Sequence, residues 1–192
     1  MKAMRGTRRW TVADYHRMAE AGILDEDDRV ELLDGEIFDM SPIGSVHAAR
    51  VGRIADRPAQ RCGDRALVRR QNPILLDDHS EPEPDIAVVL PRSDYYLLEH
   101  PKPADVLLLI EIADSSARSD RAKKLPLYAA AGIPEVWLVD LSGDRVEICR
   151  DPAEGRYATV RDLGRGTEVA PLALPDVRLE IVDLLPPPGM RP

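Results

Sequence analysis

The chain has 192 residues, of which 44% are hydrophobic and 31% are charged, and its formal net charge is −8. This length and hydrophobic content suit one domain with a sizeable core and exclude a disordered chain. The acidic balance argues against a surface that coats nucleic acid electrostatically, although 26 Lys and Arg residues leave a local basic groove open.

Targeting and redox features are sparse. No apolar run approaches the roughly 20 residues of a membrane span, and the basic N-terminus lacks the apolar stretch of a signal peptide. We therefore expect a cytoplasmic protein without membrane partners. Cys62 and Cys149 lack metal-binding spacing and the histidines are scattered, which predicts free thiols and no structural zinc. We expect a flexible basic segment over residues 1–10, a single domain over 11–185 and a Pro-rich tail over 186–192.

The N-terminal region predicts a helix followed by a hairpin. Thr11-Val-Ala-Asp14 has the pattern of a capping box, so a helix should begin here and end at Gly22. In residues 31–40, Asp34-Gly35 separates two apolar pieces and predicts a hairpin turn. A second helix is predicted over residues 46–61, and Pro58 should bend or end it.

The middle of the chain predicts strands. The apolar runs indicate strands over residues 66–70, 72–76, 85–90 and 105–113. Pro73 makes the second of these an edge or irregular piece. The last run is almost continuously apolar, which is typical of a strand buried on both faces of a sheet covered by helices.

The C-terminal part predicts a crossover unit. A helix over 119–131, kinked or delayed by Pro126, links the strand over 105–113 to a strand over 135–140, so these two strands should be parallel. A hairpin partner follows over 145–149, and a last short element lies within 179–185. The predicted fold class is α/β, with one mixed sheet and helices packed on it.

Glu111 is the most informative residue, because it lies inside the apolar run Leu107–Ile112. A carboxylate in such surroundings is costly unless it is paired or bound to a metal. Pairing with a buried arginine, or a place at an exposed strand end, is the alternative.

Asp85 follows Glu81-Pro82-Glu83-Pro84 and begins a strand. A carboxylate at a strand mouth, beside a second one on a neighbouring strand, is a site for a hard cation. The alternative is a solvated aspartate that caps a turn.

Lys124 lies on the predicted crossover helix, and helical spacing puts Asp120, Lys124 and Tyr128 on one face. An ammonium there could orient an attacking water or stabilise charge on a scissile phosphate. A solvated surface lysine is the alternative, and Lys123 is the adjacent competitor on another side of the helix.

Together these residues resemble a known family. Pro84-Asp85, Glu111 in a buried strand, and an Asp-Arg-x-x-Lys-x-x-x-Tyr helix that ends at Gly132 look like the Uma family of restriction-endonuclease-like domains. The stretches Val30–Ile37, Glu81–Asp85, Tyr128–Asp140 and Leu174–Asp176 are also similar to its pattern. The resemblance covers about residues 8 to 185.

The resemblance implies the PD-(D/E)xK nuclease superfamily, in which Asp85 and Glu111 would bind Mg²⁺ or Mn²⁺, with the Ile112 carbonyl as a further ligand. The usual lysine position is occupied here by Ala113, and Lys124 would take over from the helix. Glu31 matches an acidic position that completes the metal shell, unless it is an exposed glutamate. His47 matches a recurring position and would either contact phosphate or pack at a helix start.

The predicted activity is therefore a metal-dependent endonuclease that cleaves DNA. A catalytically idle module that binds nucleic acid or protein on the same fold is the alternative, and a metal hydrolase of small phosphoesters is a third hypothesis. A homodimer is expected, because two sites related by two-fold symmetry suit the cutting of two strands. Tyr128 and Trp137 are interpreted as core residues. Phosphate contacts are assigned to a set of arginines that otherwise form a solvated face: Arg69, Arg70, Arg118 and Arg121.

Overall fold

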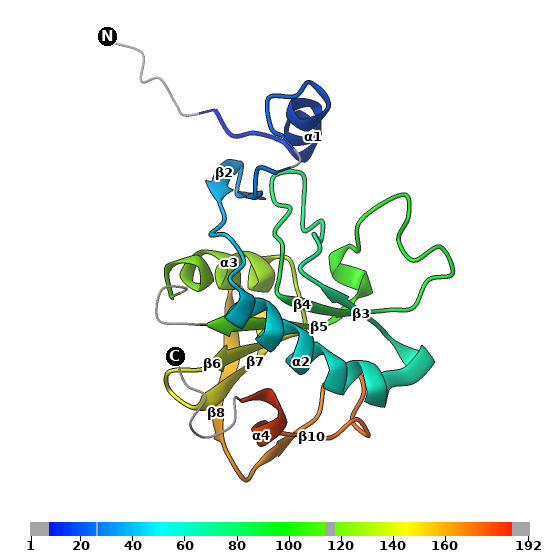
Figure 1. Ribbon diagram of the computed structural model, residues 1–192, viewed down its shortest axis with the longest axis vertical. Helices are drawn as coiled ribbons and strands as arrows, with labels where there is room; N and C mark the ends of the chain where they lie inside the picture. Colours follow the sequence, from blue (N-terminus) through cyan, green and yellow to red (C-terminus); the bar gives the residue numbers. More distant parts are fainter. Residues whose placement is uncertain (1–7, 26, 114–117, 186–192) are drawn as a thin grey trace.

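The computed structural model describes residues 8–25, 27–113 and 118–185, and within residues 118–122 it describes the backbone only. Figure 1 shows the arrangement of its elements. In chain order they are α1 (Val12–Glu20), β1 (Val30–Leu33), β2 (Glu36–Asp39), α2 (Ser45–Cys62), β3 (Leu67–Arg70), β4 (Ile86–Val89), β5 (Val106–Ala113), α3 (Arg118–Ala130), β6 (Glu135–Asp140), β7 (Arg145–Ala153), β8 (Arg156–Gly164), β9 (Glu168–Val169), β10 (Leu179–Glu180) and α4 (Ile181–Leu184). Short 3-10 turns cover Gly63–Arg65 and Pro103–Asp105.

The main sheet has six strands in the order β3-β4-β5-β6-β7-β8. Strands β5 and β6 pair in parallel, while the other neighbours pair antiparallel. This confirms the predicted crossover through α3, since a parallel pair needs a long connection. It also confirms the mixed α/β sheet.

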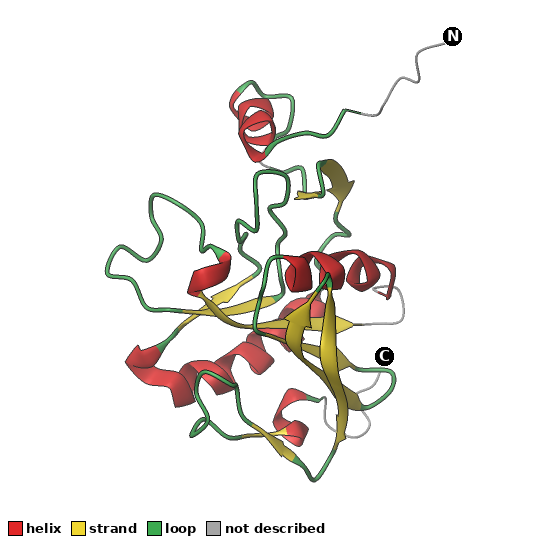
Figure 2. Ribbon diagram, turned by 180° about the vertical axis from the view of Figure 1, so that it is seen from behind, coloured by secondary structure: helices red, strands yellow, loops and turns green. Residues whose placement is uncertain are grey.

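Helices cover both faces of this sheet, and Figures 1 and 2 view it from opposite sides. On one face Val51 and Ile54 of α2 pack with Leu108 and Ile110 of β5. On the other face Tyr128 of α3 packs in a cluster that includes Leu109. Strand β5 is buried from both sides, as its unbroken apolar run predicts.

Helix α1 and the β1–β2 hairpin stand at one end of the molecule, away from the main sheet (Figure 1). Both arms of the Thr11–Asp14 capping box are present, which confirms the predicted helix start. Asp34 and Gly35 have φ values of 52° and 80°, as a type I′ hairpin turn requires. The hairpin forms a small sheet of its own, and Leu32 and Leu33 of β1 are both buried.

Three prolines bear on the predicted bounds of α2, α3 and the segment over residues 72–76. Pro58 lies inside α2 and does not end it, because the helix continues to Cys62. Helix α3 likewise contains Pro126 and begins at Arg118, not later. Residues 72–76 do not form a strand. Pro73 has no N–H, and the segment that faces residues 72–76 contains Pro82 and Pro84, so a regular ladder cannot form.

The C-terminal hairpin is longer than expected. Strand β7 extends to Ala153, and β8, which the sequence did not predict, pairs with it along most of its length. The short element over 179–185 is present as β10 and α4. Cys62 and Cys149 are not joined in a disulfide, as predicted, and both are buried. None of the helices in the described ranges is long and apolar enough to cross a membrane.

Candidate active site

Asp85 lies at the entrance to β4, where the preceding Pro84 holds the backbone extended. Its two carboxylate oxygens have separate partners. Oδ2 accepts a hydrogen bond from the backbone N–H of Ile112 at 2.8 Å, and Oδ1 lies 2.8 Å from Nε2 of His47 in the first turn of α2. The carboxylate is therefore held between β5 and α2.

Glu111 lies on β5, on the face that α3 covers, and is 7% exposed. The hydroxyl of Tyr128 donates to its Oε1 at 2.7 Å, and the backbone N–H of Asp85 lies at 3.5 Å from Oε2. Burial raises the pKa of Glu111 to about 7, a rise that Lys124 opposes and Asp85 reinforces. The two carboxylates that the sequence singled out are thus neighbours, and Glu111 is only partly compensated by protein groups.

Lys124 projects from α3 toward the same region and is 6% exposed. Its Nζ lies 2.8 Å from Oε2 of Glu31 and donates to the carbonyl of Glu83 at 3.0 Å. Burial opposes the charged form of the lysine, but the carboxylates of Glu111 and Glu31 outweigh this effect and raise its pKa. The ammonium therefore stays charged inside the protein.

Glu83 lies in the segment that leads to β4 and contacts the hairpin region through its backbone and its side chain. Its backbone N–H donates to Oε2 of Glu31 at 3.1 Å, and its own carboxylate accepts from Arg29 at 2.8 Å. Burial raises the pKa of Glu83, while Arg29 lowers it. Two residues earlier, the N–H of Glu81 donates to the Leu32 carbonyl at 2.8 Å. The Glu81–Asp85 segment is thus fastened to β1 at alternate residues.

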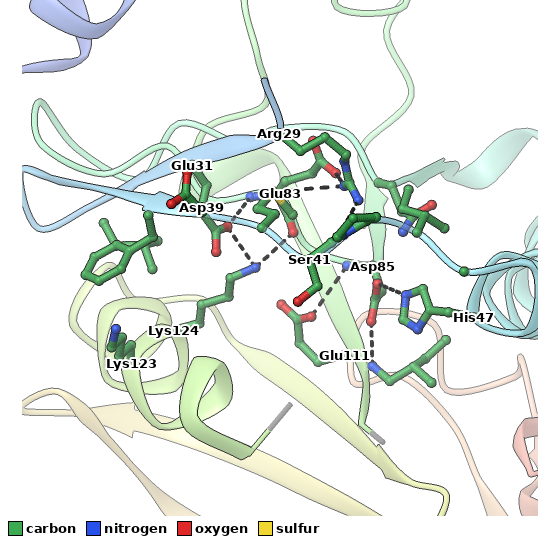
Figure 3. Close-up of a pocket in the computed structure, with 18 of the residues that line it drawn as sticks. Arg29, Glu31, Asp39, Ser41, His47, Glu83, Asp85, Glu111, Lys123 and Lys124 are labelled. Carbon is green, nitrogen blue, oxygen red and sulfur yellow. Dashed lines mark hydrogen bonds and ion pairs between the residues drawn. The ribbon is translucent and has the colours of Figure 1, made fainter. Parts of the chain in front are cut away.

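These side chains line a cavity of about 410 Å³, shown in Figure 3. Its polar wall mixes carboxylates with basic groups. The carboxylates are Glu31, Asp39, Glu83, Asp85 and Glu111, and the basic side chains are Arg29, His47, Lys123 and Lys124. Lys123, the competitor of Lys124, lies with Nζ 3.7 Å from the centre of the Phe38 ring and not in the Glu31 ion pair.

Two of the other predicted phosphate contacts lie elsewhere. Arg69 stacks over Tyr96, with 5.7 Å between its guanidinium carbon and the ring centre, and Arg70 pairs with Asp56. Neither residue lines the cavity. The side chains of Arg118 and Arg121 lie outside the described residues, as does that of Asp120.

No role at the site was predicted from the sequence for Arg29, for Glu83 or for the hydroxyl of Tyr128. The sequence interpretation of Tyr128 and Trp137 as core residues is confirmed, because both are fully buried. The hydroxyl of Tyr128 nevertheless reaches Glu111. Its position one helical turn after Lys124 was the signal that could have revealed this, since residues four apart share a helix face.

The donor set suits a hard cation. Asp85 and Glu111 offer carboxylate oxygens, which Mg²⁺ prefers, and Mg²⁺ commonly takes one or two protein carboxylates while keeping several waters. Among residues 8–25, 27–113 and 118–185, no group of three or more His, Cys, Asp and Glu side chains is arranged to hold a metal ion. Asp85 and Glu111 line an open cavity, which fits a cation held by few protein ligands.

Comparison with known proteins identifies the fold and the family. A solved structure that resembles the chain is "a putative nuclease belonging to DUF820" from Anabaena variabilis, with a TM-score of 0.70 and 18% sequence identity. The alignment covers 91% of this chain and 96% of that one, which shows a shared fold. No curated protein matched the chain. The family model described as "Putative restriction endonuclease" matches residues 12–182, so the protein belongs to the Uma2 family.

Proposed function

We propose that this chain is an endonuclease that hydrolyses phosphodiester bonds in DNA and depends on a divalent cation. The observation that carries the proposal is the pair Asp85 and Glu111, which meet at neighbouring strands with the ammonium of Lys124 in the same cavity. The family description as a restriction endonuclease supports a nuclease and favours DNA as its substrate.

Asp85 and Glu111 would hold Mg²⁺ or Mn²⁺, with the main-chain carbonyl of Ile112 as a further ligand. A bound cation polarises a phosphate and lowers the pKa of a coordinated water, which supplies a nucleophile near neutral pH. The raised pKa of Glu111 supports a cation at this place, because a positive charge would compensate the buried carboxylate that the protein compensates only in part.

The chain's own residues orient these groups. His47 holds one oxygen of Asp85, and Tyr128 holds one oxygen of Glu111. Lys124 keeps its charge in a buried position, where an ammonium can stabilise negative charge that develops on a phosphate. Two of its three N–H donors have acceptors among the described residues, in Glu31 and the Glu83 carbonyl.

The charge of the cavity bears on DNA binding. Several carboxylates line it, so without a cation they would repel the phosphate backbone. We therefore expect DNA binding near the site to depend on the divalent cation.

The test is nicking of a supercoiled plasmid in Mg²⁺ or Mn²⁺ by the wild type and by Asp85→Asn, Glu111→Gln and Lys124→Met. Each substitution should lower the cleavage rate at least about a hundredfold. Asp64→Asn changes an exposed aspartate outside the cavity and serves as the matched control, with an unchanged rate.

Cleavage that persists in Asp85→Asn, or that does not need a cation, would contradict the proposal. DNA binding without cleavage in the wild type would instead identify a binding module. Turnover of small phosphoesters without any effect of DNA would identify a different hydrolase. The expected homodimer stays a prediction, and sedimentation of the full chain checks it.

A further inference from the structure

We propose that Glu31 acts as a positioning residue for Lys124 and is not a ligand of the cation. The inference rests on the proposed function, since it divides the acidic cavity into a part that holds the cation and a part that holds the lysine. The family resemblance implies instead that Glu31 completes the metal shell, and the test distinguishes these two roles.

Glu31 reaches the site from a different sheet than the other two carboxylates. It lies on β1 of the hairpin, whereas Asp85 directly precedes β4 and Glu111 lies within β5 of the main sheet. Its side chain is 6% exposed, and its Oε2 is engaged twice. It lies 2.8 Å from Nζ of Lys124 and accepts from the N–H of Glu83 at 3.1 Å. The Glu31 carboxylate is therefore already held by two groups of the protein, the ammonium of Lys124 and the backbone N–H of Glu83.

Lys124 needs such an anchor, because its side chain is long and 8% exposed. A buried ammonium requires a partner, and holding it in one place costs side-chain entropy. Glu31 and the carbonyl of Glu83 give it two acceptors from one rigid unit, since Glu83 is itself bonded to Glu31. These three groups form a closed arrangement that fixes the ammonium.

The position of the ammonium matters for the cation. Besides Glu31, the carboxylate that most raises the pKa of Lys124 is that of Glu111. Without Glu31, Lys124 would turn to Glu111 and compete with a metal ion for the same oxygens. Glu31 would therefore keep the lysine near the cation site without letting it occupy that site.

The first experiment is Mn²⁺ binding by calorimetry to the full chain and to Glu31→Gln. Glutamine keeps an oxygen acceptor for Lys124 and for the N–H of Glu83, so affinity should stay within about threefold of the wild type. Glu111→Gln makes the same chemical change at a proposed ligand and should weaken binding at least about tenfold. A tenfold loss in Glu31→Gln would overturn the proposal and identify a third ligand.

The second experiment follows the lysine itself. A buried, hydrogen-bonded ammonium exchanges its protons slowly and gives a proton–nitrogen NMR signal, which Lys124→Met would assign by its loss. We expect Glu31→Ala to remove or shift this signal and Glu31→Gln to retain it. Glu83→Gln is the matched control and should also retain it, because the Glu83 carboxylate pairs with Arg29 and only its backbone carbonyl accepts from Lys124.

An unchanged ammonium signal in Glu31→Ala would overturn the positioning role, whatever the metal data show. Absence of Mn²⁺ binding in the wild type would instead count against the proposed nuclease. The NMR signal would still decide the role of Glu31 in that case, so the two failures are distinguishable.

Discussion

Two glutamates on neighbouring parallel strands are both buried, but they differ in how many partners the protein gives to their carboxylates. Glu135 on β6 is 0% exposed, and each of its oxygens has a strong partner. Oε1 accepts from Arg150 at 2.8 Å and from the Trp137 indole at 2.7 Å, and Oε2 accepts from the N–H of Leu172 at 2.7 Å. Its charge is compensated by an arginine that fastens β7 to β6.

Glu111 on β5 is nearly as buried as Glu135 but accepts fewer hydrogen bonds. In the described part of the chain it has one short hydrogen bond, from Tyr128, and one long one from Asp85. Burial raises its pKa to about 7, whereas Glu135 faces a guanidinium directly. The protein satisfies the first carboxylate fully and the second only in part, and a partly satisfied carboxylate is what the proposed cation site requires.

The largest effect is expected at Glu135. Glu135→Ala should lower the free energy of unfolding by about 3–5 kcal/mol, because it leaves Arg150 and the indole N–H without their acceptor. The lower end is expected, since the Arg150 side chain is 23% exposed and water can reach it. Urea unfolding measures the change. Glu168→Ala, at an exposed ion pair, should stay within about 0.5 kcal/mol. A loss below about 1 kcal/mol in Glu135→Ala would remove the contrast.

A pH-dependent effect is expected at Glu111. The folded state keeps the proton of Glu111 up to about pH 7, whereas the unfolded chain releases it near 4.5. The folded state therefore binds more protons between these values, so wild-type stability falls as the pH rises. Glu111→Gln removes this loss, and its stability relative to wild type should rise by up to about 3 kcal/mol between pH 4.5 and 7.

The check is urea unfolding of both proteins in metal-free buffer across this pH range. Above about pH 7 the difference should level off. A difference that does not change with pH would show that Glu111 is compensated as fully as Glu135.

The smallest effect is expected from the tyrosine hydroxyls. Tyr128→Phe should cost about 1–2 kcal/mol at pH 8, where Glu111 is ionised, and less at pH 5. Tyr157→Phe is the matched control, because its hydroxyl donates to the neutral carbonyl of Ile133 at 3.0 Å. Its cost should be the same at both pH values. Equal pH dependence in the two variants would show that the Tyr128 hydroxyl does not act on the charge of Glu111.

Local patterns predicted most of the fold. The capping box at Thr11, the Asp34-Gly35 turn and the apolar run of β5 each encode their structure within a few residues. Strand β8 was missed because one of its faces is largely exposed, and Tyr157 is its one buried residue among those described. Such a strand owes its existence to pairing with β7, which lies outside any local pattern.

The site divides in the same way. Asp85 and Glu111 stood out because each is a charge beside or within an apolar strand, and Lys124 stood out through its helical spacing and the family resemblance. The family resemblance placed Glu31 at the same site as a metal ligand, but its ion pair with Lys124 was not predicted, since that pair joins a hairpin to a distant helix. Local periodicity carries no information about such a contact. Tyr128 was predicted as core, and only the fold shows that its hydroxyl faces a carboxylate.

The alternation of acids and prolines from Glu81 to Asp85 also protects the site against misalignment. The N–H groups of Glu81, Glu83 and Asp85 face Leu32, Glu31 and Glu111 in turn, and the two prolines between them have no N–H to offer. A slip by one residue would place a proline at two of the three donor positions and turn each carboxylate to the other side. The observed register is therefore one in which all three N–H groups find acceptors, and in it the backbone of Asp85 faces the carboxylate of Glu111.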